Sequence, residues 1–335
     1  MRSSATELQK DARHAIVLAM GSGLELCRRF YADVVRPLVD VPHSAALMGR
    51  GSEVLGFDDE MSTDHNCEAR VLLFTEAPAE LQVPAEFEGR AASVEVHTIR
   101  EYFRLQLGWD PVLVPTLAEW LTFPESGLLM TTAGAVFHDD LGLQDVRDQL
   151  TYYPDDLWRY LMIAAWWRVH PELNLTGRAG YVGDELGSAL IGAHLVQDLM
   201  RLCFLIERQY APYSKWFGTA FSRLPCGPSI GPVLRDVLRT TTWQDREEAL
   251  AAAYRAVGEL HNERAITAPV ELGIEQLWER PFKVVWGDFP GALAAGIQDP
   301  GVRRLLDRWP VGGIEQLREL LHRVQDRRQL VALLE

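Results

Sequence analysis

Hydrophobic positions in the first part of the chain form two kinds of pattern, one helical and one typical of strands. Residues 23–39 carry apolar side chains at steps of three and four, which is the spacing of an amphipathic helix. Shorter apolar runs bounded by glycine, proline or polar residues predict β-strands. These runs are residues 44–48, 70–75, 92–97 and 135–138. The pattern therefore predicts an N-terminal half in which a helix packs on a sheet.

From residue 154 onward the spacing is almost entirely helical. Helices are predicted at residues 155–169, 184–210, 214–224, 230–239 and 243–263. The aromatic side chains in the first of these are expected to fill a helical core: Trp158, Tyr160, Trp166 and Trp167. A last strand is expected within residues 280–286, followed by three short helices. The chain is therefore predicted to be α+β, with a mixed sheet and flanking helices in residues 1–142 and a helical bundle in residues 143–335.

Composition agrees with two folded domains of ordinary type. Hydrophobic residues make up 47% and charged residues 24% of the 335 residues, which is close to the average of globular proteins. No uncharged apolar run approaches the roughly 20 residues that cross a bilayer, and residues 1–13 are polar, so a cytoplasmic protein without a membrane segment is expected. The four cysteines form no C-x-x-C pair, which predicts reduced, half-buried thiols.

The net charge of −14 opposes a long duplex nucleic acid as partner, because such binding depends on neutralising phosphates with Lys and Arg. A cationic small molecule or a protein suits this charge better. An acidic surface that only keeps the protein soluble is the alternative.

The most informative stretch runs from Met48 to Asn66. It contains a Gly-Arg-Gly-Ser turn ending at Ser52 and, after an acidic loop, the string Ser-Thr-Asp-His-Asn with Asp64 and Asn66. This order resembles the motif of the DNA polymerase β nucleotidyltransferase superfamily, in which Gly-Ser opens a helix and a carboxylate pair follows on the next strand.

The resemblance implies a site for Mg²⁺ and an NTP, with ATP as the first candidate. Backbone N–H groups at Gly51 and the Ser52 hydroxyl would contact phosphate oxygens. Asp64 and residue 66, two apart on a strand, would face one side and hold metal ions, but residue 66 is Asn. Glu95, between Val94 and Val96, is the predicted third metal ligand on a neighbouring strand.

A second resemblance extends over most of the chain. The strings GSEVLGFDDEMSTDH, YYPDDLW, GDELGS, ERQYAPYSKW, GTAF and LHN are similar to those of the bacterial family called domain of unknown function 4037. In that family a nucleotidyltransferase-like half precedes a helical half. The resemblance implies this fold and nucleotide chemistry, and it names no substrate.

The helical half supplies further candidates, which are Glu185, Lys215 and Arg178. In Gly183–Ser188 we interpret Asp184 as an N-cap and Glu185 as either a helix-start charge or a general base for the acceptor hydroxyl. Lys215 is one of only three lysines among 33 basic residues and is predicted to contact phosphate, as is Arg178. An exposed lysine at a helix start is the alternative for Lys215.

The predicted function is transfer of a nucleoside monophosphate from an NTP to a hydroxyl of a small molecule, with release of pyrophosphate. Asp64, Glu95 and Glu185 are the predicted catalytic residues. Because of Asn66, a catalytically weakened module that binds nucleotide or protein is the first alternative. A nucleotidyltransferase acting on a protein is the second.

Overall fold

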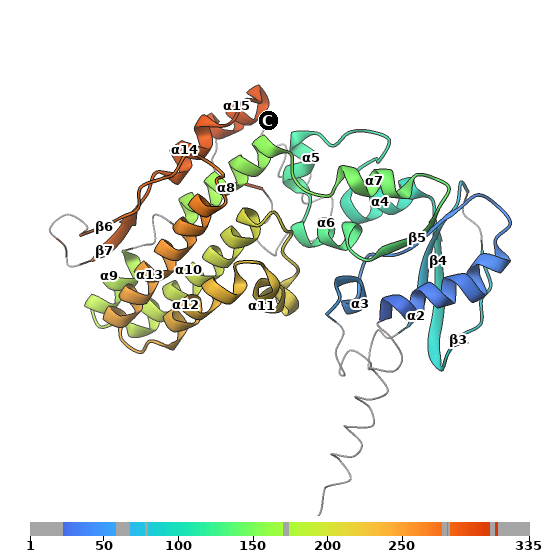
Figure 1. The fold of residues 1–335 in the computed structure, drawn as a ribbon, viewed down its shortest axis with the longest axis horizontal. Helices are drawn as coiled ribbons and strands as arrows, with labels where there is room; N and C mark the ends of the chain where they lie inside the picture. Colours follow the sequence, from blue (N-terminus) through green and yellow to red (C-terminus); the bar gives the residue numbers. More distant parts are fainter. Residues whose placement is uncertain are drawn as a thin grey trace, which may run out of the picture. The chain divides into compact units, whose positions relative to one another are not determined.

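The computed structural model of the protein describes residues 23–57, 68–77, 80–169, 174–276, 280, 282–308 and 312–313. The chain forms two compact units (Figure 1). Unit 1 contains residues 1–115 and 126–151, and unit 2 contains residues 116–125 and 152–335. The predicted boundary after residue 142 falls inside unit 1. Residues 116–125 belong to the helical unit although unit 1 continues after them.

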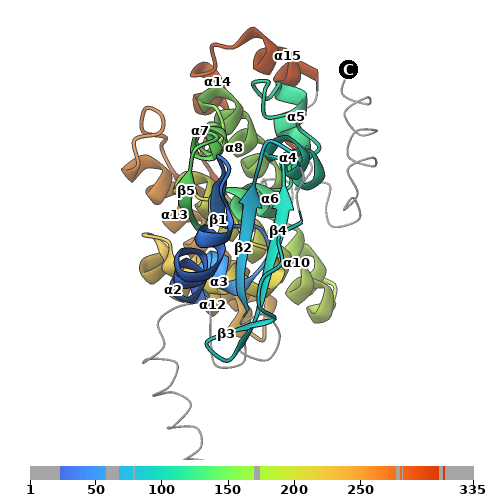
Figure 2. The ribbon, with the colours of Figure 1, turned by 90° about the vertical axis from the view of Figure 1, so that its right-hand side faces the viewer.

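Unit 1 is built on a mixed five-stranded sheet. Its strands are β1 (Ser44–Leu47), β2 (Ala69–Phe74), β3 (Glu86–Phe87), β4 (Arg90–His97) and β5 (Ala135–Asp139). They are ordered β3-β4-β2-β1-β5, with β2 and β4 parallel and the other neighbours antiparallel (Figure 2). All four predicted strands are confirmed, and β3 adds a short edge strand. The α+β class predicted from the sequence is confirmed.

Helices cover both faces of this sheet. On one face α2 (Gly23–Phe30) buries Leu26 and Phe30 against Val71 and Leu73. On the other face α4 (Ile99–Leu107) places the Tyr102 ring edge-on to Phe74, with 5.4 Å between the ring centroids. The predicted helix at residues 23–39 is one continuous helical segment that changes type, being π-helical at Tyr31–Val35 and 3-10 at Arg36–Leu38. Pro37 has no amide hydrogen to donate, so a regular α-helix cannot continue through it.

Three shorter helices complete unit 1. They are α3 (Ser52–Leu55), α6 (Glu125–Thr132), which begins at the boundary between the units, and α7 (Leu143–Gln149). The buried Arg147 of α7 donates to the carbonyls of Thr131, Thr132 and Ala133 at the end of α6. This side chain satisfies carbonyl groups that have no partner within α6.

Unit 2 is a helical bundle with a small two-stranded sheet. Its elements are α5 (Leu117–Thr122), α8 (Asp155–Val169), α9 (Leu175–Tyr181), α10 (Glu185–Ile206), α11 (Ser214–Arg223), α12 (Gly227–Arg239), α13 (Trp243–Glu263), β6 (Gly273–Gln276), β7 (Lys283–Trp286), α14 (Phe289–Ala295) and α15 (Pro300–Arg308). The five long predicted helices are confirmed, and β7 lies within the predicted strand. Its partner β6 was not predicted.

The helix α10 forms the centre of unit 2. It packs against α8, α9, α12 and α13. Its length and its mean hydropathy of 1.5 are sufficient for a membrane span, but 56% of its apolar window is buried inside the protein. It also carries Asp198, whose buried carboxylate pairs with Arg168 at 3.0 Å. These are properties of the core helix of a bundle.

The predicted core is largely confirmed. Trp158, Tyr160 and Trp166 are buried on α8, whereas Trp167 is 48% exposed, so its assignment to the core was wrong. Adjacent helical residues point about 100° apart, and Trp167 falls on the outer side of α8. Cys27, Cys203 and Cys226 are free thiols that are buried more completely than predicted. Cys67 lies outside the described residues.

Candidate functional site

Two glycines shape the turn that follows β1. Gly49 and Gly51 have φ angles of 87° and 128°, which other residues rarely adopt. A β-carbon at Gly49 would lie 2.9 Å from the Tyr102 hydroxyl oxygen, and one at Gly51 would collide with the Glu53 carboxylate. The Gly49 amide donates to the Met130 carbonyl at 2.8 Å, which attaches the turn to α6. Both conformation and space therefore require glycine here.

Arg70 of β2 holds the same turn from the side of the sheet. Its Nε donates to Glu53 Oε1 at 2.8 Å, and its terminal nitrogens donate to the Met48 carbonyl at 3.5 Å and to the Arg50 carbonyl. The Glu53 side chain is only 4% exposed and that of Arg70 18%, so solvent screens this ion pair weakly. Arg70 thus fixes the position of the backbone between Met48 and Ser52.

Neither Arg70 nor Glu53 was assigned a role from the sequence. Arg70 begins a run typical of a strand, and Glu53 follows Gly-Ser at a helix start. Each pattern has an ordinary local explanation, and only the pairing of β1 with β2 brings the two charges together. A charged residue at the start of an otherwise apolar strand is the one signal that was available.

Glu95 lies on the sheet face that also carries Arg70. Alternate residues of a strand face opposite sides. Val71 and Leu73 of β2, with Val94 and Val96 of β4, pack in the core beneath α2. Arg70 therefore faces away from α2, and the parallel register pairs Arg70 with Ser93 and Leu72 with Glu95. The turn, Arg70 and Glu95 are consequently on the same side of the sheet.

The Glu95 carboxylate is available to a ligand. Its side chain is 65% exposed, and its recorded contact is a long one of 3.4 Å with His97 Nε2. His97 in turn packs against the Tyr102 ring. Carboxylate oxygens of this kind are the donors that Mg²⁺ prefers.

Tyr102 places a buried hydroxyl group beside the turn. The residue is 3% exposed, and its hydroxyl has no hydrogen-bond partner among the described residues. Burial raises the pKa of Tyr102 well above its usual range, with Arg70 opposing the rise and Glu95 adding to it. The hydroxyl is therefore neutral, lies within electrostatic reach of both charged groups, and has a free capacity to donate a hydrogen bond.

The other residues predicted for this site are only partly described. Ser52 is 7% exposed and begins α3, which is a single turn of four residues. Such a short helix has little macrodipole, so any attraction for an anion would come from individual N–H groups at the turn. Asp64 and Asn66 lie in residues 58–67, outside the described part of the chain. Their predicted roles stay predictions.

In unit 2 Glu185 is the first residue of α10, and its carboxylate contacts the beginning of α13. Its Oε1 accepts from the Trp243 amide at 3.0 Å, and its Oε2 accepts from Arg246 at 3.2 Å. Arg246 is buried and also donates to the Ser188 hydroxyl and the Thr240 carbonyl. Asp184 caps α10 through the Gly187 amide, as predicted. Glu185 is 44% exposed, so its carboxylate connects two helices at the edge of solvent.

Lys215 and Arg178 are both exposed on unit 2. The Lys215 ammonium lies over the Trp216 ring, 4.6 Å from its centroid, at the start of α11. Arg178 is on α9. Their predicted contacts with phosphate remain predictions.

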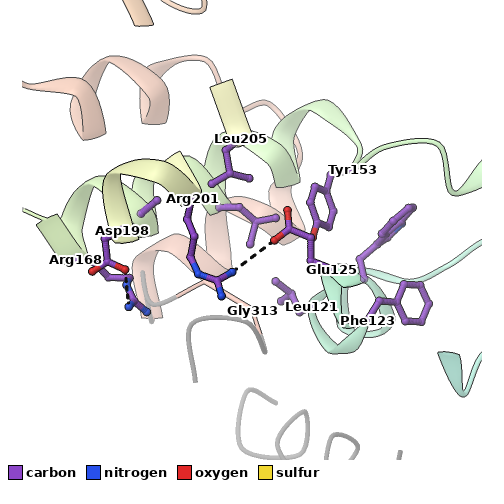
Figure 3. A pocket seen from close by; sticks show the side chains of 12 residues that line it. Leu121, Phe123, Glu125, Tyr153, Arg168, Asp198, Arg201, Leu205 and Gly313 are labelled. Atoms are coloured by element: carbon purple, nitrogen blue, oxygen red, sulfur yellow. Dashed lines mark hydrogen bonds and ion pairs between the residues drawn. The ribbon is translucent and has the colours of Figure 1, made fainter. Parts of the chain in front are cut away.

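Unit 2 contains a solvent-open pocket (Figure 3). One part of its lining is aromatic, with Trp120, Phe123 and Tyr153. The other part carries two ion pairs, Arg201 with Glu125 at 3.8 Å and Arg168 with Asp198 at 3.0 Å. Such a lining suits a small molecule that has apolar parts and several hydrogen-bonding groups. No sequence pattern indicated it, because its residues come from segments that are distant in the sequence.

Comparisons with known proteins find a family model and a solved structure that are similar to this chain. One similar solved structure is described as a nucleotidyltransferase-like protein from Exiguobacterium sibiricum 255-15. The alignment covers 78% of this chain and 97% of that protein's chain, with 13% sequence identity and a TM-score of 0.32. No curated protein matches the chain. The family model of Domain of unknown function (DUF4037) matches residues 120–217. The family resemblance predicted from the sequence is therefore confirmed over residues 120–217, which are similar to the DUF4037 family.

Proposed function

We propose that the protein transfers a nucleoside monophosphate from an NTP, with ATP as the first candidate, to a hydroxyl group of a small molecule. One observation carries the proposal: Arg70 fixes the glycine turn on the sheet face from which Glu95 projects. A glycine turn and a carboxylate on the same face are features that a site for a triphosphate with its metal requires. The Tyr102 hydroxyl beside the turn adds a donor that has no partner within the described part of the chain.

The roles of the residues follow from their chemistry. The backbone at Gly51 and the Ser52 hydroxyl would bind phosphate oxygens. Glu95, Asp64 and the Asn66 amide oxygen would together offer oxygen donors of the kind that Mg²⁺ prefers, and the ion would neutralise charge on the triphosphate when bound. Lys215 and Arg178 are the predicted additional phosphate contacts.

In the proposed reaction the acceptor oxygen bonds to the α-phosphorus. The bond from that phosphorus to the oxygen bridging to the β-phosphate breaks, and pyrophosphate leaves with the electron pair. The hydroxyl proton passes to a base, for which Glu185 is the predicted residue. Glu185 already accepts hydrogen bonds from Trp243 and Arg246, so a proton could bind only at a lone pair that those donors leave open.

We propose the pocket of unit 2 as the site for the acceptor. Its aromatic part would contact an apolar portion of the molecule, and its two ion pairs would offer both donors and acceptors. Each carboxylate already has an arginine partner, so the pocket by itself gives no strong preference for a cation. A cationic acceptor is proposed from the net charge alone. The cytoplasm, where ATP and Mg²⁺ are present, is the proposed compartment.

A module that binds nucleotide or protein without turnover is the second candidate. Two observations favour it: Asn66 stands where the resembling motif has a carboxylate, and the Glu185 carboxylate is engaged with α13. Release of labelled pyrophosphate from ATP and Mg²⁺, measured against a panel of hydroxyl-bearing acceptors, separates the candidates.

We expect turnover with at least one acceptor class, and a decrease of about a hundredfold or more in Asp64→Ala and Glu95→Gln. Glu86→Gln is the matched control, because Glu86 is an exposed carboxylate on the neighbouring strand β3. Binding of ATP without pyrophosphate release in any reaction would favour the second candidate. A mass gain of one nucleotide on a protein in a lysate would identify a protein acceptor instead.

A further inference from the structure

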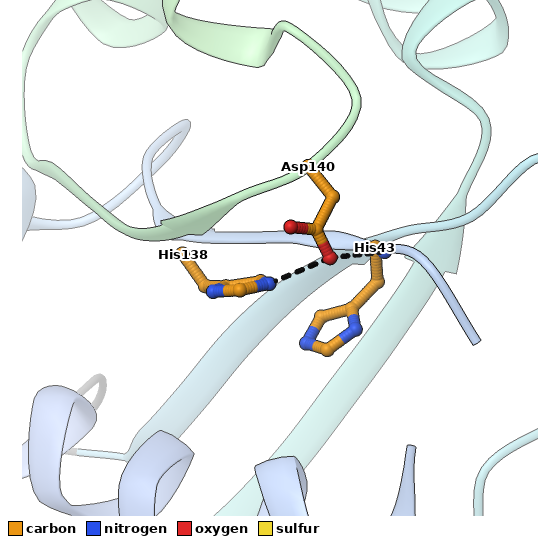
Figure 4. A group of neighbouring side chains, drawn as sticks. All are labelled: His43, His138 and Asp140. Atoms are coloured by element: carbon orange, nitrogen blue, oxygen red, sulfur yellow. Dashed lines mark hydrogen bonds and ion pairs between the residues drawn. The ribbon is translucent and has the colours of Figure 1, made fainter. Parts of the chain in front are cut away.

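Two histidines and one aspartate meet at the other end of β1 from the glycine turn (Figure 4). They are His43, which directly precedes β1, and His138 and Asp140 at the end of β5. Each offers one ligand atom, and these three atoms lie within 4.8 Å of one another. It is the only such group that the described residues contain.

The register of the sheet brings these side chains together. The antiparallel pair of β1 and β5 matches Ser44 with Asp139, and the Asp140 amide donates to the His43 carbonyl one position further. His43 is therefore directly opposite Asp140, and opposite residues of an antiparallel pair face the same side. His138 is two residues from Asp140 and shares that side. The backbone register alone therefore brings the side chains of His43, His138 and Asp140 to the same side of the sheet.

The hydrogen bonds of His43 leave it in the tautomer that can ligate through Nε2. Its Nδ1 lies 2.9 Å from the Val41 carbonyl, which can only accept, so Nδ1 carries the proton. Its Nε2, 2.9 Å from the Tyr31 hydroxyl, then has the lone pair and accepts from that group. A histidine whose second nitrogen donates to a backbone carbonyl is the usual arrangement at metal sites.

The other two ligands are accessible and already adjacent. His138 Nε2 and Asp140 Oδ2 are 2.8 Å apart, and their side chains are 29% and 45% exposed. The hydrogen bond from His138, followed by that from the His43 amide, lowers the pKa of Asp140, so its carboxylate is ionised at neutral pH. His43 closes the inner side of the cluster, being 5% exposed.

We propose that His43, His138 and Asp140 bind a first-row transition-metal dication, with Zn²⁺ as the reference ion. Two imidazoles and one carboxylate are ligands that Zn²⁺ accepts, and three protein ligands leave a fourth position for water. Binding would replace the Tyr31 hydrogen bond at His43 and the hydrogen bond between His138 and Asp140. A neutral His138 would then carry its proton on Nδ1, so that Nε2 can ligate the ion. The bound ion would connect the start of β1 to the end of β5. This site is independent of the proposed nucleotide chemistry.

The test uses the full chain without a histidine tag, treated with chelator and then titrated with Zn²⁺ by calorimetry. We expect one ion to bind at this site and to raise the melting temperature, because the folded chain alone presents the ligands together. His138→Ala and Asp140→Asn should each weaken this binding about tenfold or more. The control is His194→Ala, which disrupts a histidine–aspartate pair, with Asp198, in unit 2.

Two results would overturn the proposal. One is absence of Zn²⁺ binding to the wild-type chain at up to about ten equivalents, which would leave the cluster as a hydrogen-bonded group only. The other is binding that His138→Ala and Asp140→Asn leave unchanged. If either variant loses its near-ultraviolet circular dichroism, Co²⁺ on the wild-type chain decides. Intense visible absorption bands, which are typical of four- or five-coordinate Co²⁺, would support the site. Weak bands, like those of the hexaaqua ion, would refute it.

Discussion

Arg70 is the side chain that most directly determines the shape of the glycine turn. It connects β2 to the carboxylate of Glu53 and to two backbone carbonyls of the turn. Both charges of the pair are largely removed from solvent. Removing one partner of such a pair is costly, because the other charge remains buried without its counter-charge.

We expect Arg70→Met to lower the free energy of unfolding by about 3 kcal/mol, measured by urea denaturation. ATP affinity should fall as well, because the carbonyls of Met48 and Arg50 lose the donor that positions them. The double variant Glu53→Gln/Arg70→Met separates the two effects. Removing both charges should restore much of the stability, while ATP affinity stays low.

The turn has no role in nucleotide binding if the Arg70→Met chain is destabilised as expected and binds ATP as tightly as the wild type. Stability that is unchanged in the single variant would instead contradict the buried ion pair itself.

At the scale of single elements, α13 contains a histidine that the protein keeps neutral. His261 is fully buried, its Nε2 lies 3.2 Å from the Thr267 hydroxyl, and its ring packs against Phe289. Burial lowers the pKa of His261 from 6.5 to about 4. Protonation of the folded chain would place a charge among aromatic side chains, which the low pKa reflects.

This pKa predicts that unit 2 loses stability in acid. Above about pH 6.5 His261 is neutral in both states and its full contribution is present. As the pH falls from about 6.5 towards about 4, the unfolded chain takes up a proton that the folded chain does not, so stability is lost. We expect this residue to account for about 2 to 3 kcal/mol of loss between about pH 7 and pH 4.5.

Subtracting the unfolding free energies of His261→Leu from those of the wild type isolates this effect, since other titrating groups cancel. When both chains are unfolded with urea, the stability advantage of the wild type should decrease by about 2 to 3 kcal/mol from about pH 7 to pH 4.5. A difference that does not change with pH would show that His261 titrates alike in the folded and unfolded chains.

At the scale of the whole molecule, the sequence predicted those features that repeat along a segment. The three- and four-residue steps identified α8, α10, α11, α12 and α13, and the short apolar or β-rich runs identified β1, β2, β4 and β5. Trp167 was wrongly predicted to lie in the core. The apolar residues of α8 form a nearly continuous run, and such a run does not show which side of the helix faces solvent. The edge strand β3 and the pair of β6 with β7 depend on partners that local pattern does not show.

Features that depend on contacts between distant residues could not be predicted. Glu53 and Arg70, and likewise His43 and Asp140, meet because of sheet register. Glu185 was correctly placed at the start of a helix, but its contact with Trp243 and Arg246 requires knowing that α10 and α13 are adjacent. The face of β4 on which Glu95 lies could be predicted from its two valine neighbours, whereas its role as a metal ligand stays a prediction.

The central claim is that the glycine turn, Asp64 and Glu95 together bind a divalent cation that carries a triphosphate. Calorimetric titration of the chain with ATP, in Mg²⁺ and in chelator, tests it most directly. We predict that Mg²⁺ tightens ATP binding to the wild-type chain and to Glu86→Gln, and that this gain disappears in Asp64→Ala and in Glu95→Gln. Absence of ATP binding, or a gain from Mg²⁺ that persists in both variants, would contradict the account.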